Sequence, residues 1–355
     1  MSKKLEKRLS WVDEIFRVRG PHQTRFHKLR LDKNERVSDF TKNFFHKTIK
    51  KIKHEHLTTY PEVENLYDLL SKKLKVNKNS LILTAGADGA IRSCFDLCVS
   101  KGDTVITLSP TFAMIDIYIK FFKAKQIKIK YDHNLRLNYE KLINSINSKI
   151  SLIVFANPNS PTGTILNHEQ VYSILQKAKK NGVTVLIDEA YFGFTSYTAL
   201  PFIKKFSNLV VARTFSKSFG LAGCRAGYLV SQTSLAKRLF KLKPMYEINS
   251  IAVLIATELL KNHSLVKRYL RETRKGKEYL ADKLDTLNLK YLESHANFLH
   301  INFGKNKKIA ERLFKKNNIL VKGGPGVTGF ENYLRVTLGP KKYMHEVVKV
   351  IKKIS

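Results

Sequence analysis

Residues 213–225 read "RTFSKSFGLAGCR" and set Lys217 between Ser216 and Ser218. Glycines and other small residues follow this lysine, and the stretch ends on Arg225. A lysine on a solvated helix face usually stands among other charges, as in "KKIKHEH" at 50–56. The hydroxyls and flexible backbone around Lys217 therefore raise the question of a chemical role for this residue.

The length and composition predict an ordinary globular chain. Its 355 residues and 43% hydrophobic content suffice for two domains, or for one large α/β domain with a smaller lobe. No apolar run reaches the roughly 18 to 20 residues that span a bilayer, and "MSKKLEKRLSWVDEIF" has no apolar export region. We expect a cytoplasmic protein without a metal site, because its histidines and its three cysteines (Cys94, Cys98 and Cys224) form no ligand pattern.

The formal net charge of +35 is the unusual feature of the composition. A strongly basic chain raises nucleic acid or a membrane surface as a partner. The basic residues are mostly lysine and are spread over the whole length, which favours a solvated surface without either partner. Attraction of anionic, phosphorylated substrates remains open.

Short apolar runs alternate with helix-length segments through the first two thirds of the chain. Such alternation predicts an α/β fold, a mostly parallel sheet with helices on both faces. The runs are "LILTA" (81–85), "DTVITL" (103–108), "SLIVFA" (151–156), "TVLIDEA" (184–190), "LVVARTF" (209–215) and "AGYLVS" (226–231). A long helical stretch over 249–287 then begins a smaller α+β lobe. We predict a large domain over 45–248 and a small domain formed by 1–44 and 249–355.

Polar residues follow several of these strands, where loops of an open α/β sheet converge on a ligand. Gly86, Ala87 and Asp88 open a helix, and its free N–H groups can bind phosphate, although such starts are common caps. Asn157 stands in "NPNSPTG", where a plain proline-rich turn is the alternative. Asp188 ends an apolar strand, and its buried carboxylate needs a cation, which a structural salt bridge also supplies.

Together with Lys217 and Arg225, these residues fit one cofactor. A lysine forms a Schiff base with an aldehyde, and a carboxylate keeps a pyridine nitrogen protonated. An amide and a phenol can bond a ring hydroxyl, while a helix end, a serine and an arginine hold a phosphate. Pyridoxal 5'-phosphate carries this set of groups.

The chain resembles the fold-type I aminotransferases of class I/II, and within them the histidinol-phosphate aminotransferase family. The motifs that carry the resemblance occur in order over nearly the whole chain after residue 28. They are "LDKNE", "YPE", "TAGADGA", "SPTF", "NPNSPTG", "IDEAY", "RTFSKSFGLAGCRAGY", "KPMYEINS", "HANFLHINF" and "YLRVTLG".

The resemblance implies roles for individual residues around the cofactor ring. Lys217 would form the Schiff base and move the substrate proton, and Asp188 would hold the pyridinium. Asn157 and Tyr191 would bond the phenolic oxygen of the ring, and Phe112 would stack on it. Lys217, Asp188 and Tyr191 are thus the expected catalytic residues.

The resemblance also implies a phosphate site, a homodimer and a substrate arginine. The phosphate would be held by the start of the helix at Gly86, Ala87 and Asp88 and by Thr214, Ser216 and Arg225. Tyr60 would reach the phosphate of a neighbouring subunit. Arg335 would receive a substrate carboxylate as a bidentate pair.

The sequence departs from the family where the amino substrate binds. Arg36 and Val37 follow Asn34 and Glu35 in place of Asn-Pro, Glu247 replaces an asparagine beside Tyr246, and Lys322 stands near a usual arginine. We expect Asn34, Tyr246, Lys322 and Arg335 to contact a small phosphorylated amine or its carbonyl partner, with glutamate and 2-oxoglutarate as the second pair.

A decarboxylase of phosphorylated amino acids, resembling threonine-phosphate decarboxylase, is the alternative, because it needs the same cofactor groups. A nucleic-acid-binding protein would leave Lys217, Asp188 and Asn157 unexplained.

Overall fold

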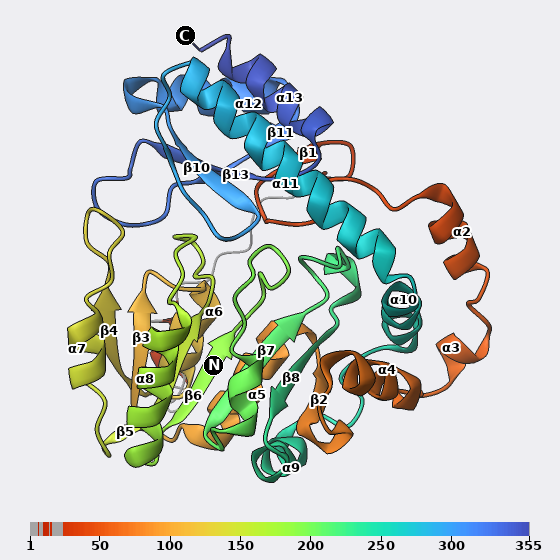
Figure 1. Cartoon of the computed structure of the whole chain (residues 1–355), viewed down its shortest axis with the longest axis vertical. Helices are drawn as coiled ribbons and strands as arrows, with labels where there is room; N and C mark the ends of the chain where they lie inside the picture. Colours follow the sequence, from red (N-terminus) through yellow and green to blue (C-terminus); the bar gives the residue numbers. More distant parts are fainter. Residues whose placement is uncertain (1–5, 7–9, 14, 16–23, 355) are drawn as a thin grey trace.

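The computed structural model describes residues 6, 10–13, 15 and 24–354 and consists of two stacked lobes (Figure 1). The start of the predicted segment 1–44 therefore lies largely outside the described residues. Among those residues, no helix has the length and apolar character of a membrane span. The cytoplasmic location stays a prediction.

The larger lobe is built on a seven-stranded sheet with the order β2-β8-β7-β6-β5-β3-β4. The pairs from β7 through β6, β5 and β3 to β4 are parallel, and β8 runs antiparallel to β7 and β2. This confirms the predicted, mostly parallel sheet. The strands are β2 (Leu81–Thr84), β3 (Thr104–Ser109), β4 (Lys125–Lys130), β5 (Ile150–Ala156), β6 (Thr184–Asp188), β7 (Leu209–Thr214) and β8 (Gly227–Ser231).

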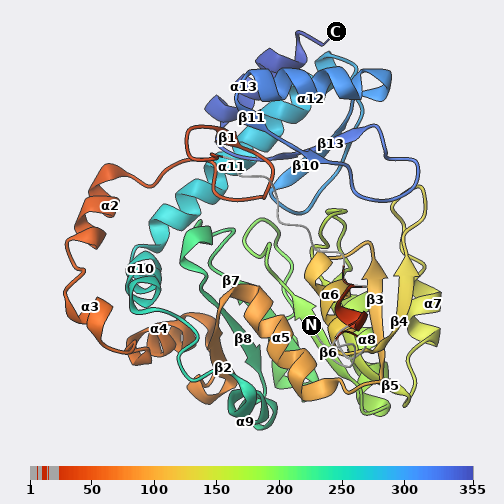
Figure 2. The same cartoon turned by 180° about the vertical axis from the view of Figure 1, so that it is seen from behind.

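Both faces of this sheet are covered by helices, as the continuous apolar strands predicted. Side chains alternate along β7, so Val211 joins one buried cluster, and Val210 and Ala212 join the other. Figure 2 shows α5 (Gly86–Cys98) and α6 (Ala113–Phe121) crossing one face, to which α9 (Thr233–Leu242) also contributes. The other cluster draws on α4 (Glu64–Leu74), α7 (Tyr139–Asn144), α8 (His168–Lys180) and α10 (Ser250–Lys261).

Two features differ from the prediction. Strand β4 was not predicted, because "KQIKIK" alternates lysine with isoleucine and forms no continuous apolar run. It lies at the edge of the sheet, where exposed lysines discourage pairing with another chain. The helix expected over 249–287 is two helices, α10 and α11 (His263–Thr286), because the backbone of Asn262 leaves the helical region at φ −102° and ψ 46°.

The smaller lobe has a hydrophobic cluster of its own and a four-stranded antiparallel sheet. The sheet has the order β12 (Lys322–Gly323), β13 (Tyr333–Thr337), β10 (Phe298–Asn302) and β9 (Tyr291–Leu292), and α11, α12 (Lys307–Lys316) and α13 (Lys341–Ile351) pack on it. Helix α11 contributes Val266 to the cluster of the large lobe and Leu280 to that of the small lobe. The predicted boundary after residue 248 stays a prediction.

The N-terminal segment joins the small lobe in space. Strand β1 (Leu29–Arg30) pairs in parallel with β11 (Ile319–Leu320), and Leu31 is buried in the small cluster. The chain then runs through α2 (Lys42–Ile49) and α3 (Glu55–Thr58) along one side of the molecule toward α4 (Figure 1). Residues 29–37 therefore belong to the small lobe in space and lie on its side that faces the large lobe.

Candidate active site between the two lobes

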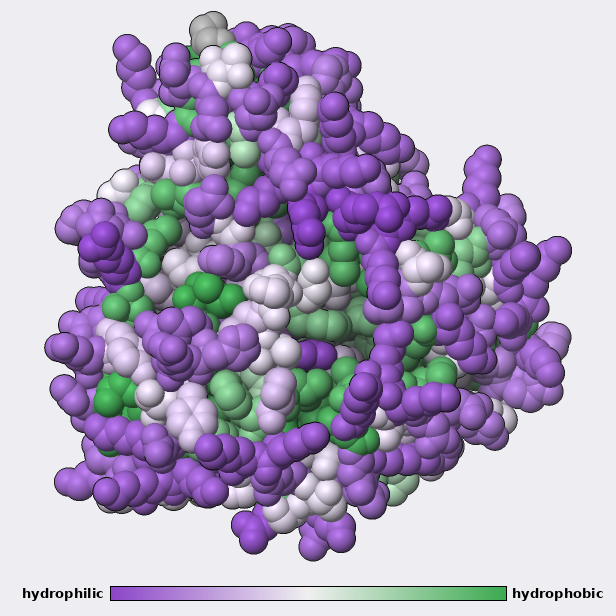
Figure 3. Space-filling view, viewed as in Figure 1, coloured by the Kyte–Doolittle hydropathy of each residue, from purple (hydrophilic) through white to green (hydrophobic). Residues whose placement is uncertain are grey.

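The predicted site residues follow the carboxyl ends of adjacent parallel strands. Ala156, Asp188 and Ala212 are paired across β5, β6 and β7, and the backbone N–H of Asn157 donates to the carbonyl oxygen of Asp188 over 2.9 Å. The arrowheads of β3 and β4 point to the small lobe, so this edge of the sheet faces it (Figure 1). Figure 3 shows a band of apolar and weakly polar residues across the middle of this view, between mainly hydrophilic surfaces.

The neighbouring carboxylates Asp188 and Glu189 have different partners. Glu189 is fully buried and pairs with the Arg213 guanidinium, with 2.9 Å between Oε2 and Nη2. Asp188 is also buried, and its carboxylate accepts a hydrogen bond from the backbone N–H of Ala190, 2.9 Å away. Burial raises the pKa of Asp188 to about 7. The structural salt bridge therefore belongs to Glu189, while Asp188 has the setting that a cationic ring nitrogen requires.

Lys217 has no carboxylate partner among the ion pairs of the described residues. Its ammonium group donates to the backbone carbonyl oxygen of Lys33, 2.8 Å away, and lies 5.9 Å from the ring centroid of Tyr191. Burial lowers the pKa of Lys217, and the positive charges of Arg335 and Arg225 lower it further. A lysine held in this way is suited to act as a nucleophile or base.

A set of residues suited to bind phosphate lies around the start of α5. Gly86 has φ +74°, and a Cβ there would stand 2.9 Å from Nη2 of Arg225. Arg225 donates from Nη1 to Ser216 Oγ over 3.1 Å, and the Thr214 hydroxyl donates to the same oxygen over 2.9 Å. A helix N-terminus, two hydroxyls and a guanidinium fit a phosphate dianion.

The side chains expected around the cofactor ring are ordered by local hydrogen bonds. The Asn157 amide donates to the Leu166 carbonyl oxygen over 2.9 Å and accepts from the Leu166 N–H over 2.8 Å, which fixes its plane. The Tyr191 phenol accepts from Asn34 Nδ2 over 2.8 Å and donates to Ser160 Oγ over 3.3 Å. Phe112 is half-buried at the start of α6.

Asn34 links the N-terminal segment to both lobes. It is buried with φ 56°, and its Oδ1 accepts from the Thr337 hydroxyl of the small lobe over 3.1 Å. Its amide N–H meanwhile bonds Tyr191 of the large lobe. The structure thus brings Asn34 into contact with a predicted ring residue.

The predicted substrate cations lie on adjacent strands of the small lobe. Arg335 on β13 donates from Nη2 to the Asp32 carbonyl oxygen over 2.8 Å, and its Cζ lies 5.1 Å from the Phe298 ring centroid. Lys322 on β12 pairs with Arg335 and is exposed. Because directly paired residues of antiparallel strands share a face, both cations stand side by side on one face of the small sheet.

Tyr60 and Tyr246 contact each other on the surface of the single chain. They are 71% and 50% exposed, and their rings stack with centroids 4.0 Å apart and an angle of 10°. No contact of Tyr60 with Thr214, Ser216 or Arg225 of its own chain is found in the described part. Glu247, next to Tyr246, accepts from the Ala85 N–H over 3.0 Å, just before α5.

Three participants in this network were not predicted from the sequence. Ser160 accepts from Tyr191, the Lys33 carbonyl oxygen accepts from Lys217, and His300 contacts the Pro161 carbonyl oxygen at 2.7 Å. Ser160 and Pro161 stand in the quoted "NPNSPTG", but nothing in that pattern indicates these partners. Every residue has a backbone carbonyl oxygen, so a sequence does not indicate which of them accepts a hydrogen bond from a site residue.

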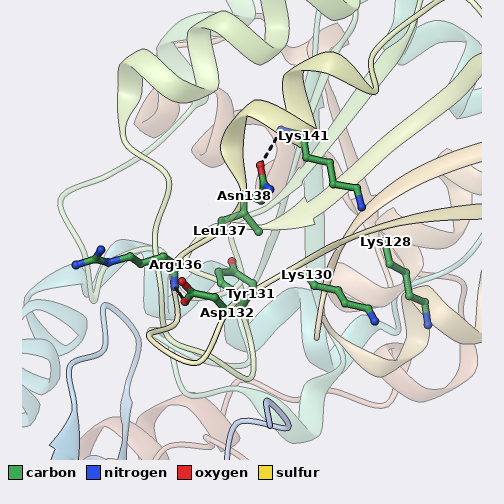
Figure 4. A pocket seen from close by; sticks show the side chains of 8 residues that line it. All are labelled: Lys128, Lys130, Tyr131, Asp132, Arg136, Leu137, Asn138 and Lys141. Carbon is green, nitrogen blue, oxygen red and sulfur yellow. Dashed lines mark hydrogen bonds between the residues drawn. The ribbon is translucent and has the colours of Figure 1, made fainter. Parts of the chain in front are cut away.

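A separate basic cavity of about 530 Å³ lies on the edge of the large sheet (Figure 4). Lys128, Lys130 and Lys141 point their ammonium groups to the same side, while Arg136 points away from them (Figure 4). None of its lining residues belongs to the predicted site. We attribute this cluster to protection of the edge strand β4.

Residues 30–351 match the model of the family "Aminotransferase class I and II". The histidinol-phosphate aminotransferase of Caldanaerobacter subterraneus subsp. tengcongensis is 33% identical over 334 residues, 92% of this chain and 93% of that protein. The fold of the present chain resembles that of histidinol-phosphate aminotransferase from Sinorhizobium meliloti in complex with pyridoxal-5'-phosphate. The TM-score is 0.81 at 23% identity, and the match covers 92% of this chain and 91% of that one. The fold also resembles that of L-threonine-O-3-phosphate decarboxylase from Porphyromonas gingivalis, with a TM-score of 0.76, 19% identity and coverage of 92% and 98%. The chain belongs to the class I and II aminotransferases and has the fold-type I architecture of pyridoxal-phosphate-dependent enzymes.

Proposed function

We propose that this protein transfers an amino group between glutamate and a small phosphorylated carbonyl compound, in the manner of a histidinol-phosphate aminotransferase. The observation that carries the proposal is Asp188, a buried carboxylate that forms no ion pair with any residue the structure describes. It ends β6, the strand that lies between β5, which Asn157 follows, and β7, which Thr214 ends. Lys217, Ser216 and Arg225 lie on the segment after β7, and Arg225 faces Gly86 at the start of α5. These groups fit pyridoxal phosphate in charge and donor type.

When bound, pyridoxal phosphate supplies an aldehyde that condenses with amines and a protonated ring that withdraws electrons. The proposal assigns Asp188 to accept the hydrogen bond of the ring N–H, which keeps that proton in place. The backbone of Ala87 and Asp88 and the side chains of Thr214, Ser216 and Arg225 hold the phosphate. Lys217 removes the proton from the substrate Cα and delivers it to the cofactor carbon.

Tyr191, Asn157 and Phe112 orient the ring in this proposal. Asn34 donates to the Tyr191 oxygen, so the phenol uses its own hydrogen for an acceptor, which is Ser160 Oγ at 3.3 Å in this structure. The proposal assigns that hydrogen and the second N–H of Asn157 to the ring oxygen. Phe112 packs on the ring face.

The substrate side rests on Arg335, whose planar donors match the carboxylate of glutamate. A phosphorylated amine of the histidinol-phosphate type has no carboxylate, so two binding modes are needed. We assign its phosphate to Arg335 and Lys322, with Asn34 and Tyr246 beside the substrate. The net charge of +35 favours such anions at longer range.

A homodimer completes the proposed site. Tyr60 is exposed and contacts none of the phosphate-binding residues of its own chain, so it is free to serve a second subunit. The proposal assigns its phenol to the phosphate in the partner's site. The division into a large domain over 45–248 and a small domain of 1–44 and 249–355 belongs to the same proposal.

Single-turnover spectroscopy of the cofactor-loaded enzyme tests the function. We expect glutamate and a phosphorylated amine each to convert the cofactor, with release of 2-oxoglutarate and of the carbonyl product. The decarboxylase alternative uses the same residues and differs in which Cα bond breaks. Release of carbon dioxide from a phosphorylated amino acid, without formation of a keto acid, would overturn the proposal.

A further inference from the structure

The inference concerns His300 and Arg335, which are direct partners across β10 and β13. Directly opposite residues on antiparallel strands lie on the same face with Cβ atoms about 4.5–5.5 Å apart. Phe298 lies on that face and packs against Tyr191 of the large lobe, whereas Leu299 and Ile301 belong to the core of the small lobe. His300 therefore faces the active site and not the small-lobe core.

The hydrogen bonds of His300 define its tautomer. The imidazole is fully buried, and Nε2 lies 2.7 Å from the Pro161 carbonyl oxygen, which can only accept. Nε2 therefore carries the hydrogen. Burial, with a contribution from the charge of Arg335, lowers the pKa of His300 to about 4. The ring is neutral at physiological pH, and Nδ1 presents a bare lone pair.

Within the described part of the chain, two complementary atoms of this residue pair have no hydrogen-bond partner. Nδ1 of His300 is buried without a hydrogen bond, and so is the Nε–H group of Arg335. One is an acceptor and the other a donor. Arg335 is otherwise held by a bond from Nη2 to the Asp32 carbonyl oxygen. A buried polar group without a hydrogen bond is destabilising, which favours an arrangement that joins the two.

We propose that His300 is a positioning residue for Arg335, accepting the Nε–H through Nδ1 when the guanidinium engages a substrate carboxylate. With Nε held by His300 and Nη2 by Asp32, the end of the fork is left for two parallel bonds to the carboxylate. The neutral ring adds no second positive charge beside Arg335. This inference rests on the proposed function, because it gives Arg335 the glutamate carboxylate.

Two substitutions separate this role from simple support of the lobe contact. Asn at 300 can place its Oδ1 near the position of Nδ1, while Gln can place its Nε2 near the position of the imidazole Nε2. His300→Asn therefore keeps the acceptor for Arg335, and His300→Gln keeps the donor to Pro161. We expect His300→Gln to raise KM for glutamate roughly tenfold with little change in kcat, and His300→Asn to raise it much less.

The test measures the glutamate half-reaction and, separately, the thermal stabilisation of each variant by glutarate. Ile301→Val on the opposite face of β10 serves as the control for lost small-lobe packing. His300→Gln should lose most of its glutarate stabilisation while Ile301→Val keeps it. In an Arg335→Lys background, which has no Nε–H, His300→Gln should have no further effect on KM or on glutarate stabilisation.

The opposite order, with His300→Asn impaired and His300→Gln normal, would overturn the inference in favour of a role confined to the Pro161 contact. An equal additional loss in the Arg335→Lys background would overturn it as well. A wild-type enzyme that shows no turnover of glutamate would instead contradict the proposed function. The two failures are thereby distinguishable.

Discussion

The ammonium group of Lys217 on the large lobe donates to the backbone carbonyl oxygen of Lys33 on the N-terminal segment, with 2.8 Å between Nζ and O. The next residue, Asn34, bonds both Tyr191 and Thr337. Residues 33 and 34 thus contact two of the three predicted catalytic side chains. The segment that contains them was predicted to belong to the small domain, with Asn34 as a substrate-binding residue, and it contacts predicted catalytic side chains of the large lobe.

The first prediction concerns Lys217. Lys217→Ala should lower transamination by at least about 10²-fold, because the variant lacks the group that moves the Cα proton. Borohydride reduction of the wild-type enzyme, followed by peptide mapping, should find the cofactor attached to the peptide that contains Lys217. Lys130→Ala, on the exposed edge strand, is the matched control and should keep its activity. Labelling of another lysine would contradict the assignment.

The second prediction concerns the charge of Asp188. Asp188→Asn keeps the shape and the bond from Ala190 but removes the anion that holds the ring proton. Activity should fall by about 10²- to 10³-fold while the fold persists. Turnover assays and circular dichroism on the same preparation check both parts. Near-normal turnover would eliminate the proposed role of Asp188.

The third prediction concerns the stability of the cofactor-free protein. Burial raises the pKa of Asp188 from 3.8 to about 7, so folding favours its protonated form. The contribution of this group to the free energy of unfolding is fully present below pH 3.8 and is lost as the pH rises to about 7. The loss amounts to about 1.4 kcal/mol for each unit by which the pKa is shifted. Asp188→Asn should therefore be more stable than wild type at pH 8, and the difference should shrink toward pH 5. Denaturant unfolding of both apoproteins measures it, and a pH-independent difference would refute the explanation.

The fourth prediction concerns the dimer. If Tyr60 serves the partner's phosphate, mixed dimers of Tyr60→Ala and Lys217→Ala subunits contain one site with both substitutions and one with neither. Mixing and re-equilibrating the two impaired variants should then recover part of the wild-type activity. Sedimentation analysis should show dimers throughout. A fully active monomer would exclude this arrangement.

The fifth prediction concerns Arg335. Arg335→Lys keeps the charge but loses the planar fork, so KM for glutamate should rise by about tenfold or more. A phosphorylated substrate should be affected less, because phosphate tolerates a point charge. Kinetics of the two half-reactions decide it. Equal losses for both would contradict the two binding modes, and an unchanged glutamate reaction would remove Arg335 from the site.

Much of the large sheet could be predicted because its strands are local features. Runs such as "SLIVFA" and "TVLIDEA" are apolar enough to be buried on both faces, and polar residues mark their ends. Strand β4 was not predicted because half of its side chains are lysine, and its pairing with β3 is what defines it as a strand. The break at Asn262 escaped because the apolar pattern of α10 and α11 runs through it.

The residue types of the candidate site, with Lys217, Asp188 and Arg225 at or near strand ends, could be predicted from the sequence alone, since side-chain chemistry and the apolar runs that form strands are local features. Which partner each group has depended on the tertiary structure. Asp188 and Glu189 are adjacent in sequence and both carry carboxylates, yet Arg213 forms its ion pair with Glu189. Asn34 and Thr337 are 303 positions apart, and the His300 and Arg335 atoms become complementary only when β10 pairs with β13. Hydrogen bonds are effective only within about 3 Å, so partners far apart in the chain become defined when packing of the two lobes brings them together.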